Sequence, residues 1–587
     1  MTFPILGGNT GIAAYEIDNS LRFNDGDSAH LDNTFSTTTN RKTYSYSTWI
    51  KRSVLDGANQ HIFGVYIDSS NHSLFRFDSG EKLDIRNNLN TIVFQLDSDM
   101  VFRDTSAWYH ILIVTDTTES TASDRIKAYV NGTQITLSGT YPTLNKDTYI
   151  NDNRLHTIAE VSSGAEEFDG YMAETHFIDG SAKQPSDFGE FDSDSGIWKP
   201  IEYTGSYGTN GFYLKFSNSS DFGEDFSGNN NDFTASNLAS TDQTTDTPTN
   251  NFATINPLDK APSLTLAEGN LQQTSPANGT YNYYARSNFV IPENSGKWFW
   301  EVKVTSSFIR CATGISQIDG AIGLSGSDSN SSTVNLSTSP RIWIVSHGGG
   351  VEGAGSSTSS FSGCAWNTQN DIATFMYDSD AGEIYFAVNG TIGNSGNALV
   401  TGITGNVTPI HRTYGTTSGS QITTIQVNHG NPVYSLSSAV NDANGYGNFE
   451  YAPSSGYKSL CTQNLATALS PTIDDGSEHF NTVLWSGDGN TNRTISGVGF
   501  QPDWTWIKRR SSTYSHALLD SNRGGGKALS SDNNDAENTN NNILSSWNSD
   551  GFVIALSGVS AFSNTSGQTY VGWNWKANGG TTSSNTD

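Results

Sequence analysis

Short stretches in which apolar and polar residues alternate constrain this chain more than any other feature of its sequence. Examples are Tyr44–Ile50, Trp108–Val114 and Tyr570–Trp575, and clusters of Gly, Asn, Asp and Ser separate such stretches along the chain. Alternation with a period of two is typical of a β-strand. Charged residues make up only 15% of the sequence, and runs rich in Ala, Leu, Glu and Lys are scarce, which argues against helices. The sequence therefore predicts an all-β protein.

The length of 587 residues predicts several domains, because a single core seldom organises so long a chain. We expect five segments: an N-terminal docking segment (1–18), a β-sandwich (19–226), a connector (227–262), a second β-sandwich (263–452) and a Trp-rich β domain with a polar tail (453–587). The connector is rich in Asn, Thr and Ser. Two interpretations of it stay open: an extended segment that packs through Phe233, Leu238 and Phe252, or a mobile linker.

The formal net charge of −28 excludes two classes of partner. Such a field repels phosphate backbones and anionic headgroups, so we expect no nucleic-acid binding. No stretch approaches 18 consecutive apolar residues, so we expect no membrane insertion either.

The cysteines and the start of the chain bear on the compartment. Three scattered cysteines do not make a disulfide framework, and we expect Cys311 and Cys364 to be buried free thiols. Residues Met1–Ile17 lack the basic start and apolar stretch of an export signal. A large β protein of this kind suits a virus, whose particles assemble in the host cytoplasm.

Four motifs in the first sandwich resemble the laminin-G-like, concanavalin A-type family. They stand in the family's order: Trp49-Ile50-Lys51-Arg52, Trp108-Tyr109-His110-Ile111, Ala128-Tyr129-Val130-Asn131-Gly132, and Phe168-Asp169-Gly170 through Gly180. Asn131-Gly132 between two strand-like stretches is also a strong hairpin signal. The resemblance implies a two-sheet jelly roll.

The second sandwich is similar to SPRY domains. The stretches that carry this resemblance are Gly296–Val302 (GKWFWEV), Gly382–Gly390 (GEIYFAVNG) and Val407–Ile410 (VTPI). SPRY domains are also concanavalin A-like sandwiches. The third segment carries Gly499-Phe500-Gln501-Pro502-Asp503, which resembles a motif that follows SPRY-like modules in large marine-phage structural proteins.

Taken in this order, the modules resemble tail-fibre and particle-surface proteins of tailed bacteriophages. The resemblance implies a non-enzymatic virion structural protein on the particle exterior, which binds other virion proteins and a glycan or protein of the host surface. It also implies a homo-oligomer, for example a trimer as in many fibres. One alternative is a capsid-decoration or head-fibre protein, and another is a polysaccharide-depolymerising tailspike.

The carboxylates of a jelly-roll glucanase are incomplete in this sequence. Such enzymes carry Glu-x-Asp-x-x-Glu, and two carboxylates about 5.5 Å apart support retaining chemistry. Here Glu167 and Asp169 supply the first two positions, but Met172 occupies the third. Strict alternation places Glu174 on the face opposite to Glu167. We therefore expect no enzyme activity and no catalytic residues.

Calcium is the one metal that the sequence leaves open, and otherwise we expect no cofactor. Laminin-G-like sandwiches often hold calcium at one rim through Asp and Asn oxygens. The candidate ligands are Asp25, Asp27, Asp488 and Asn490. Because Asp, Asn and Gly are also the commonest turn residues, turns without metal are the favoured interpretation.

Sugar binding requires exposed aromatic rings beside amide or carboxylate groups. The candidate platforms are Trp198, Tyr203, Tyr207 and Tyr213 in the first sandwich, and Trp343 and Trp366 in the second. Trp49, Trp108, Trp298 and Trp300 lie inside strand motifs, and we expect them in the core.

Overall fold

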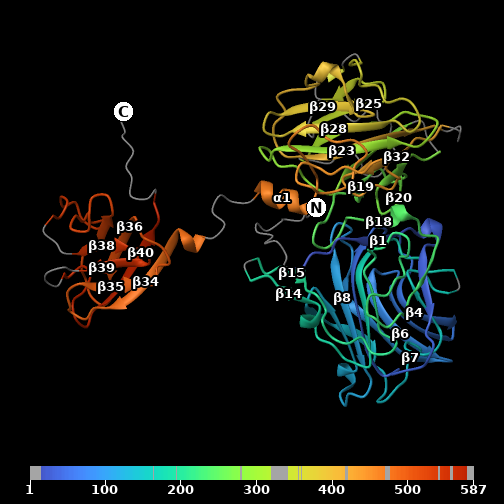
Figure 1. Cartoon of the computed structure of the whole chain (residues 1–587), viewed down its shortest axis with the longest axis horizontal. Helices are drawn as coiled ribbons and strands as arrows, with labels where there is room; N and C mark the ends of the chain where they lie inside the picture. Colours follow the sequence, from blue (N-terminus) through green and yellow to red (C-terminus); the bar gives the residue numbers. More distant parts are fainter. Residues whose placement is uncertain are drawn as a thin grey trace. The chain divides into compact units, whose positions relative to one another are not determined.

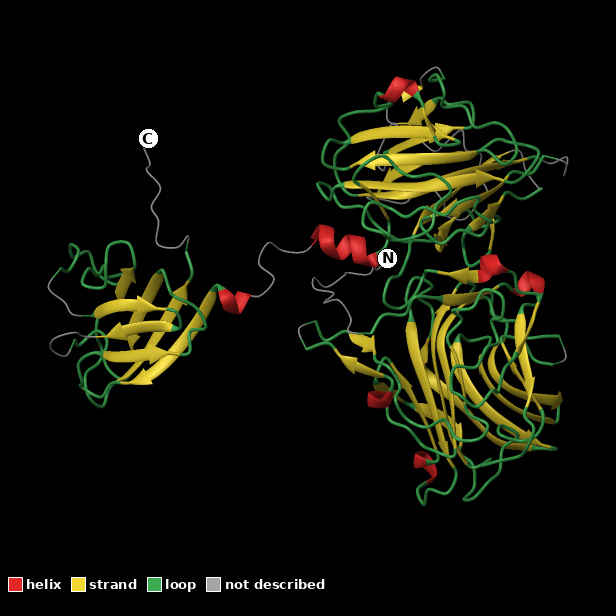
Figure 2. Cartoon of the chain, in the orientation of Figure 1, coloured by secondary structure: helices red, strands yellow, loops and turns green. Residues whose placement is uncertain are grey.

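A computed structural model describes most of the chain and shows it to be almost entirely β-structure (Figures 1 and 2). The described residues are 15–162, 164–193, 195–277, 281–318, 341–353, 356–357, 360–416, 421–469, 476–539, 543–554 and 560–577. They form two compact units, Met1–Ser470 and Pro471–Asp587. The predicted all-β class is confirmed. Within the described part of the chain, no helix is long and apolar enough to cross a membrane.

The first sandwich consists of two antiparallel sheets. One contains, in spatial order, β10 (Thr133–Ile135), β9 (Ile126–Val130), β8 (Tyr109–Asp116), β3 (Thr43–Arg52), β13 (Gly170–Asp179), β1 (Ser20–Phe23) and β18 (Gln243–Thr244), with β16 (Phe212–Leu214) paired to β13. The other contains β11 (Leu137–Thr140), β7 (Ile92–Val101), β6 (Lys82–Leu89), β5 (Asn71–Phe77), β4 (Gln60–Asp68), β12 (Leu155–Ile158), β2 (His30–Thr34) and β17 (Thr234–Ser236). A separate hairpin pairs β14 (Gly189–Phe191) with β15 (Trp198–Pro200).

Aromatic residues from facing strands join these two sheets. Tyr46 of β3 stacks on Phe63 of β4 with ring centroids 4.7 Å apart, and Phe177 of β13 lies 5.6 Å from the same ring. Burying one such side chain contributes roughly 1.5–3 kcal/mol. The alternation read from the sequence therefore has its expected physical cause, a dry layer between two sheets.

The second sandwich has the same two-sheet construction. One sheet contains β19 (Ile255–Lys260), β22 (Tyr281–Ser287), β31 (Val407–Gly415), β24 (Ala312–Gln317), β25 (Ile342–Ser346), β26 (Val351–Gly353) and β27 (Ser356–Ser357). The other contains β20 (Thr265–Ala267), β21 (Gln272–Thr274), β32 (Thr424–Asn428), β23 (Lys297–Val304), β28 (Ile372–Asp378), β29 (Glu383–Val388) and β30 (Thr391–Ile392), with β33 (Tyr457–Ser459) parallel to β23.

Trp300 connects the two sheets of the second sandwich. Its ring stacks on Phe375 at 4.7 Å, and its Nε1 donates a hydrogen bond of 3.0 Å to Thr313 on the facing sheet. Trp298 is fully buried as well, as are Trp49 and Trp108 to at least nine-tenths in the first sandwich. The prediction that these four tryptophans are core residues is confirmed.

The unit Pro471–Asp587 is a smaller two-sheet structure. One sheet contains β34 (Phe480–Ser486), β40 (Thr569–Trp575), β36 (Trp504–Arg509) and β37 (Ala517–Asp520), and the other contains β35 (Arg493–Ser496), β39 (Gly551–Ile554) and β38 (Leu544–Asn548). Trp485 of β34 packs on Phe552 of β39 at 5.7 Å between the sheets. On the outer face, Trp504 lies opposite Trp575 and Trp506 opposite Trp573, so each pair shares one face as the alternation predicts.

Helical structure is confined to short segments. The α-helix among the described residues is α1 (Thr462–Leu469). The 3-10 turns are η1 (Asp25–Asp27), η2 (Ala122–Asp124), η3 (Pro185–Asp187), η4 (Ser240–Asp242), η6 (Asn394–Gly396) and η7 (Gly476–Glu478).

The connector is packed onto both sandwiches. Phe233 and Phe252 are buried, β17 and β18 extend the two sheets of the first sandwich, and β19 opens the second. The first sandwich thus gains strands beyond the boundary expected at residue 226. Residues 457–469 lie with the second sandwich, beyond the boundary expected at residue 453, because β33 pairs with β23 and Leu465 of α1 is part of that core.

Turns follow the residues that their backbone requires. Asn131 and Gly132 both have positive φ, at 46° and 76°, and join β9 to β10 in a two-residue hairpin. This conformation suits a type I′ turn, in which Asn-Gly is the favoured pair. The hairpin predicted from the sequence is confirmed.

Several buried histidines are held in the neutral form. Burial lowers the pKa of His61 and His156 to about 4 and that of His411 to about 3. All three are fully buried, and a charged imidazole there would lose its hydration. An unfolded histidine titrates near 6.5, so between these values the unfolded chain binds more protons than the folded one.

We therefore predict that the first unit loses stability as the pH falls below about 6.5, with most of the loss complete near the lowered pKa values. The contribution of His411 is full above pH 6.5 and falls by on the order of 3 kcal/mol near pH 4. Thermal melting of the wild type and His411→Gln, compared at pH 7 and pH 4.5, measures this. The variant should show the smaller drop, whereas His479→Gln in the other unit should behave like the wild type. Equal drops in His411→Gln and the wild type would contradict the prediction.

Candidate functional site

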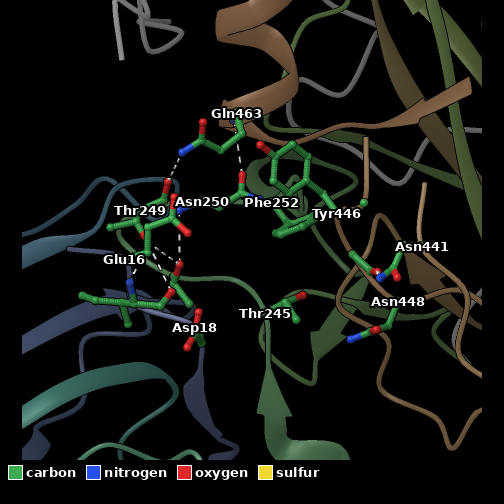
Figure 3. A pocket seen from close by; sticks show the side chains of 14 residues that line it. Glu16, Asp18, Thr245, Thr249, Asn250, Phe252, Asn441, Tyr446, Asn448 and Gln463 are labelled. Atoms are coloured by element: carbon green, nitrogen blue, oxygen red, sulfur yellow. Dashed lines mark hydrogen bonds between the residues drawn. The ribbon is translucent and has the colours of Figure 1, made fainter. Parts of the chain in front are cut away.

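A pocket of about 180 Å³ lies where the two sandwiches of the first unit meet (Figure 3). It is smaller than the roughly 300–1,000 Å³ of pockets for drug-sized ligands, so it fits one small group such as a single sugar ring. Four chain segments line it: the start of the first sandwich, the connector, the loop that follows β32, and the first turn of α1. The lining residues are Glu16, Ile17, Asp18, Thr245, Thr247, Thr249, Asn250, Phe252, Asn441, Gly445, Tyr446, Gly447, Asn448 and Gln463.

A buried carboxylate shapes one wall of this pocket. Asp442 is 7% exposed, and its Oδ1 accepts hydrogen bonds from the backbone N–H groups of Asn444 (2.8 Å) and Tyr446 (2.9 Å). Its Oδ2 accepts from the backbone N–H and hydroxyl of Ser459 and from Nδ2 of Asn464 on α1. A charged acceptor bound by five donors is a strong local constraint, and it fixes the turn that presents Tyr446.

The loop that carries Tyr446 packs closely against the backbone at Gly430. Gly447 has a φ of +69°, and a Cβ there would lie 2.7 Å from the Cα of Gly430. The side chain of Asn441 donates to the carbonyl of Gly447 at 2.5 Å and closes the loop. Only glycine fits this conformation and this approach, so the loop geometry is encoded in the sequence at that position.

The opposite wall combines the connector with the segment before β1. Thr249 accepts a hydrogen bond from the backbone N–H of Ile17 at 3.1 Å and donates to its carbonyl at 3.2 Å. Nε2 of Gln463 donates to the carbonyl of Thr249 at 2.9 Å. These bonds hold Glu16 and Asp18, on either side of Ile17, toward the pocket as Figure 3 shows.

The electrostatics of the pocket restrict what it can bind. The carboxylates of Glu16 and Asp18 are exposed and form no ion pair with another described residue. Partial burial, followed by negative neighbours that include Glu16, raises the pKa of Tyr446, so its hydroxyl remains a donor. Two carboxylates repel an anion and accept hydrogen bonds from hydroxyl groups. The arrangement suits a neutral, hydroxyl-rich ligand with an apolar face for the Tyr446 ring.

Two of the aromatic platforms expected from the sequence lie in the core. Trp366 is fully buried and donates from Nε1 to the carbonyl of Ser346 at 2.9 Å, and Trp343 is 7% exposed. The prediction that they offer open rings is wrong, because both fill the space between the sheets of the second sandwich.

The other four aromatic candidates pack against one another on the outer face of the first sandwich. Tyr203 is buried and stacks on Phe188 at 5.0 Å, and Tyr213 stacks on His176 at 4.3 Å. Tyr207 lies within hydrogen-bonding distance of His176, at 3.0 Å. Trp198 covers the Asn131-Gly132 turn so closely that a Cβ on Gly132 would lie 2.4 Å from its ring. These rings therefore pack against other parts of the protein.

The acidic residues near β13 occupy separate environments. A β-bulge between Ala173 and His176 changes the alternation, and Glu174, at a φ of 47°, accepts hydrogen bonds from the hydroxyls of Tyr15 (2.8 Å) and Tyr213 (2.7 Å). Burial would raise the pKa of Glu174, but its hydrogen-bonding and charged neighbours, His176 first, lower it. Burial first, and then the charge of Asp25, raise the pKa of Asp169 well above its usual range.

The calcium candidates lie in turns. Asp25 and Asp27 are exposed in η1, where Asp27 accepts a hydrogen bond from Asn24 at 2.9 Å. Asp488 accepts from the backbone N–H of Asn490 at 2.9 Å, and these bonds lower the pKa of Asp488 to about 2. Among the residues that the structure describes, no group of three or more His, Cys, Asp or Glu side chains could hold a metal ion.

The pocket could not be predicted from the sequence because its lining is scattered over about 450 positions of the chain. Asp442-Ala443-Asn444-Gly445-Tyr446-Gly447 reads as an ordinary turn. The available signal was the pair of glycines around Tyr446, which marks a constrained loop that carries an aromatic side chain. Nothing in the sequence indicates that Glu16 and Asp18 face it.

Comparison with protein families agrees with the fold. Residues 23–185 match the concanavalin A-like lectin/glucanases superfamily, and the first sandwich is therefore a laminin-G-like, concanavalin A-like domain as predicted. Residues 475–587 match a domain family of unknown function (DUF7483). No curated protein matches the chain.

Among solved structures, similar chains include the SPRY domain of human HERC1, at 16% identity over 30% of this chain and 96% of that one, with a TM-score of 0.22. The PSpry domain of TRIM65 is 13% identical over 30% of this chain and 88% of that one, with a TM-score of 0.21. A heptameric SAP-like pentraxin from Limulus polyphemus is 16% identical over 29% and 80%, also with a TM-score of 0.21.

We predict that Asp442→Ala destabilises the first unit by several kcal/mol, because each buried donor that loses its acceptor costs about 1–3 kcal/mol. The melting temperature should fall, and the 442–446 turn should become sensitive to limited proteolysis. Asp56→Ala is the matched control, since Asp56 also caps a turn but is exposed. A melting temperature equal to that of Asp56→Ala would show that the carboxylate does not organise the loop.

Proposed function

We propose that this protein is a non-enzymatic surface component of a tailed-phage particle, which binds neutral glycans of the host surface through the pocket between its two sandwiches. The observation that carries the proposal is the pocket's lining: a half-buried Tyr446 ring, amide side chains and two exposed carboxylates. Sugars have apolar C–H faces and many hydroxyl groups, and this lining complements both.

The place on a virion rests on the order of the modules. A laminin-G-like sandwich, a second sandwich with SPRY-like motifs and a Trp-rich C-terminal module resemble tail-fibre and particle-surface proteins. A tail fibre or another receptor-binding component is the favoured location, with other virion proteins as partners. A capsid-decoration protein with the same modules is the alternative.

A binding role is favoured over a depolymerising one by the carboxylates of the first sandwich. Glu174 is held by two tyrosines and His176, whereas Asp169 is buried beside Asp25. Hydrolysis of a glycosidic bond requires a pair that flanks the substrate. Neither Glu174 nor Asp169 lines the pocket, and the two carboxylates that do, Glu16 and Asp18, lie on one wall and do not flank it from two sides.

One shallow pocket binds a sugar weakly, and the proposal therefore includes many copies. When several copies face one cell, the second binding event is intramolecular, and avidity can exceed single-site affinity by roughly 10²–10⁴. Homo-oligomerisation, for example as a trimer, would supply such copies.

The pocket is tested by glycan-array binding followed by calorimetry with the best neutral oligosaccharide. We predict that Tyr446→Ala and Asn448→Ala each weaken binding at least about tenfold, which corresponds to about 1.4 kcal/mol. Glycans with carboxylate or sulfate groups should bind less well than neutral ones. Tyr514→Ala, an exposed tyrosine of the other unit, is the control and should bind like the wild type. Equal affinity of all variants would contradict the proposal that this pocket binds the glycan.

The location is tested on purified particles of the phage that encodes the chain. Immunogold labelling at the tail tip supports a receptor-binding component, and labelling over the head supports a decoration protein. Shortened polysaccharide chains after incubation with the purified protein would contradict the non-enzymatic proposal.

A further inference from the structure

Lys51 on β3 is a buried lysine whose ammonium group contacts a carboxylate and a carboxamide at once. Its Nζ donates hydrogen bonds of 2.7 Å to Oδ2 of Asp246 and of 2.7 Å to Oδ1 of Asn251. The side chain of Lys51 is 1% exposed and that of Asp246 is fully buried. A C=O bond is about 1.2 Å long, so the carbonyl carbon of Asn251 lies just beyond the oxygen that Lys51 contacts.

The surroundings of the three groups are largely aromatic. Nζ of Lys51 lies 5.4 Å from the centre of the Tyr171 ring, and Nε1 of Trp108 donates to the other oxygen of Asp246 at 3.1 Å. Phe252, next in sequence to Asn251, is fully buried. In such a desolvated place the separated charges of Lys⁺ and Asp⁻ are costly, and moving one proton from the amine to the carboxylate removes both.

The carboxamide of Asn251 is held in one orientation. Its Nδ2 donates to the carbonyl of Ser106 at 2.7 Å, and its backbone N–H donates to the hydroxyl of Thr462 at 3.0 Å. The amine, the acceptor carbon and a proton carrier are therefore fixed in contact, which raises the effective concentration of the reacting groups.

We propose that Lys51 and Asn251 form an intramolecular isopeptide bond, with Asp246 as the proton carrier. Asp246 takes a proton from the Lys51 ammonium, and the neutral amine attacks the side-chain carbonyl carbon of Asn251. Asp246 then returns the proton to the departing nitrogen and takes up the second proton of Nζ, which leaves with the ammonia as ammonium. The carbon–Nδ2 bond breaks, a carbon–Nζ amide bond forms, and one ammonia leaves. Nothing is oxidised or reduced, and no further reactant is needed.

The acidity of Asp246 agrees with this role. Burial raises its pKa, even against the opposing charge and hydrogen bond of Lys51. A carboxylate with a raised pKa accepts a proton more readily, and once protonated it can act as general acid toward the leaving ammonia.

The bond would give the first unit a covalent cross-link, which it otherwise lacks. Cys311, Cys364 and Cys461 are all free and buried, so none of them forms a disulfide. The new amide would tie β3 of the first sandwich to the connector immediately before β19 of the second. Pulling the connector away from β3 would then require breaking an amide bond.

Intact-mass spectrometry of the full-length, purified protein tests the proposal. We expect a mass lower than that of the printed sequence by one ammonia, and a tryptic digest that contains a branched peptide joining Lys51 to Asn251, without cleavage after Lys51. A mass equal to that of the sequence, with ordinary cleavage after Lys51, would overturn the proposal. Simple deamidation of Asn251 raises the mass and leaves no branched peptide, which would overturn it too.

Variants identify the role of each group. Lys51→Met removes the nucleophile and Asp246→Asn removes the proton carrier at nearly constant shape, and both should show the full sequence mass. Lys458→Met is the matched control, because Lys458 also lies over an aromatic ring, 4.9 Å from that of Trp298, and this variant should keep the bond. A branched peptide in Asp246→Asn at the wild-type level would exclude Asp246 as proton carrier. Should a variant fail to fold, the wild-type mass still decides.

Discussion

The buried contact between Lys51 and Asp246 is the interaction on which the first unit depends. Removing one partner of a buried pair typically costs 3–5 kcal/mol, because the other charge stays behind without compensation. Here the pair does more than satisfy two charges, since Asp246 belongs to the connector and Lys51 to the first sandwich. Asp246 also lies between Thr245 and Thr247, both of which line the pocket. The same contact therefore holds the connector wall of the pocket against the first sandwich.

Buried carboxylates recur as organisers of loops elsewhere in the unit. Glu301 on β23 accepts hydrogen bonds from the backbone N–H groups of Glu450 and Tyr451 and from Asn428 and Tyr434, and so anchors the chain that follows the sandwich. Asp442 does the same for the turn before Tyr446. In both cases backbone N–H groups that no strand satisfies find a charged acceptor, which permits an irregular loop to be ordered.

Alternation predicted the strands well because each sheet of a two-layer sandwich has one buried face. Every strand must therefore have apolar residues at alternate positions of its own sequence. The Asn131-Gly132 turn was predictable for the same reason, since its backbone conformation is a property of two residues. Trp343 and Trp366 were misassigned because the exposure of a ring depends on which side chains of the facing sheet cover it. The bulge that turns Glu174 toward Tyr15 and Tyr213 also escaped the alternation argument, because one extra residue changes the face without changing composition.

The sequence by itself determined the β class, the laminin-G-like nature of the first sandwich and the cores of the strands, since each of these rests on periodicity or on a local motif. Only the tertiary structure brought Glu16, Asn250 and Tyr446 to one pocket and Lys51, Asp246 and Asn251 to one contact. The physical reason is that such contacts join residues about 200 or more positions apart. Their proximity follows from how sheets and connector pack, and no local pattern records it.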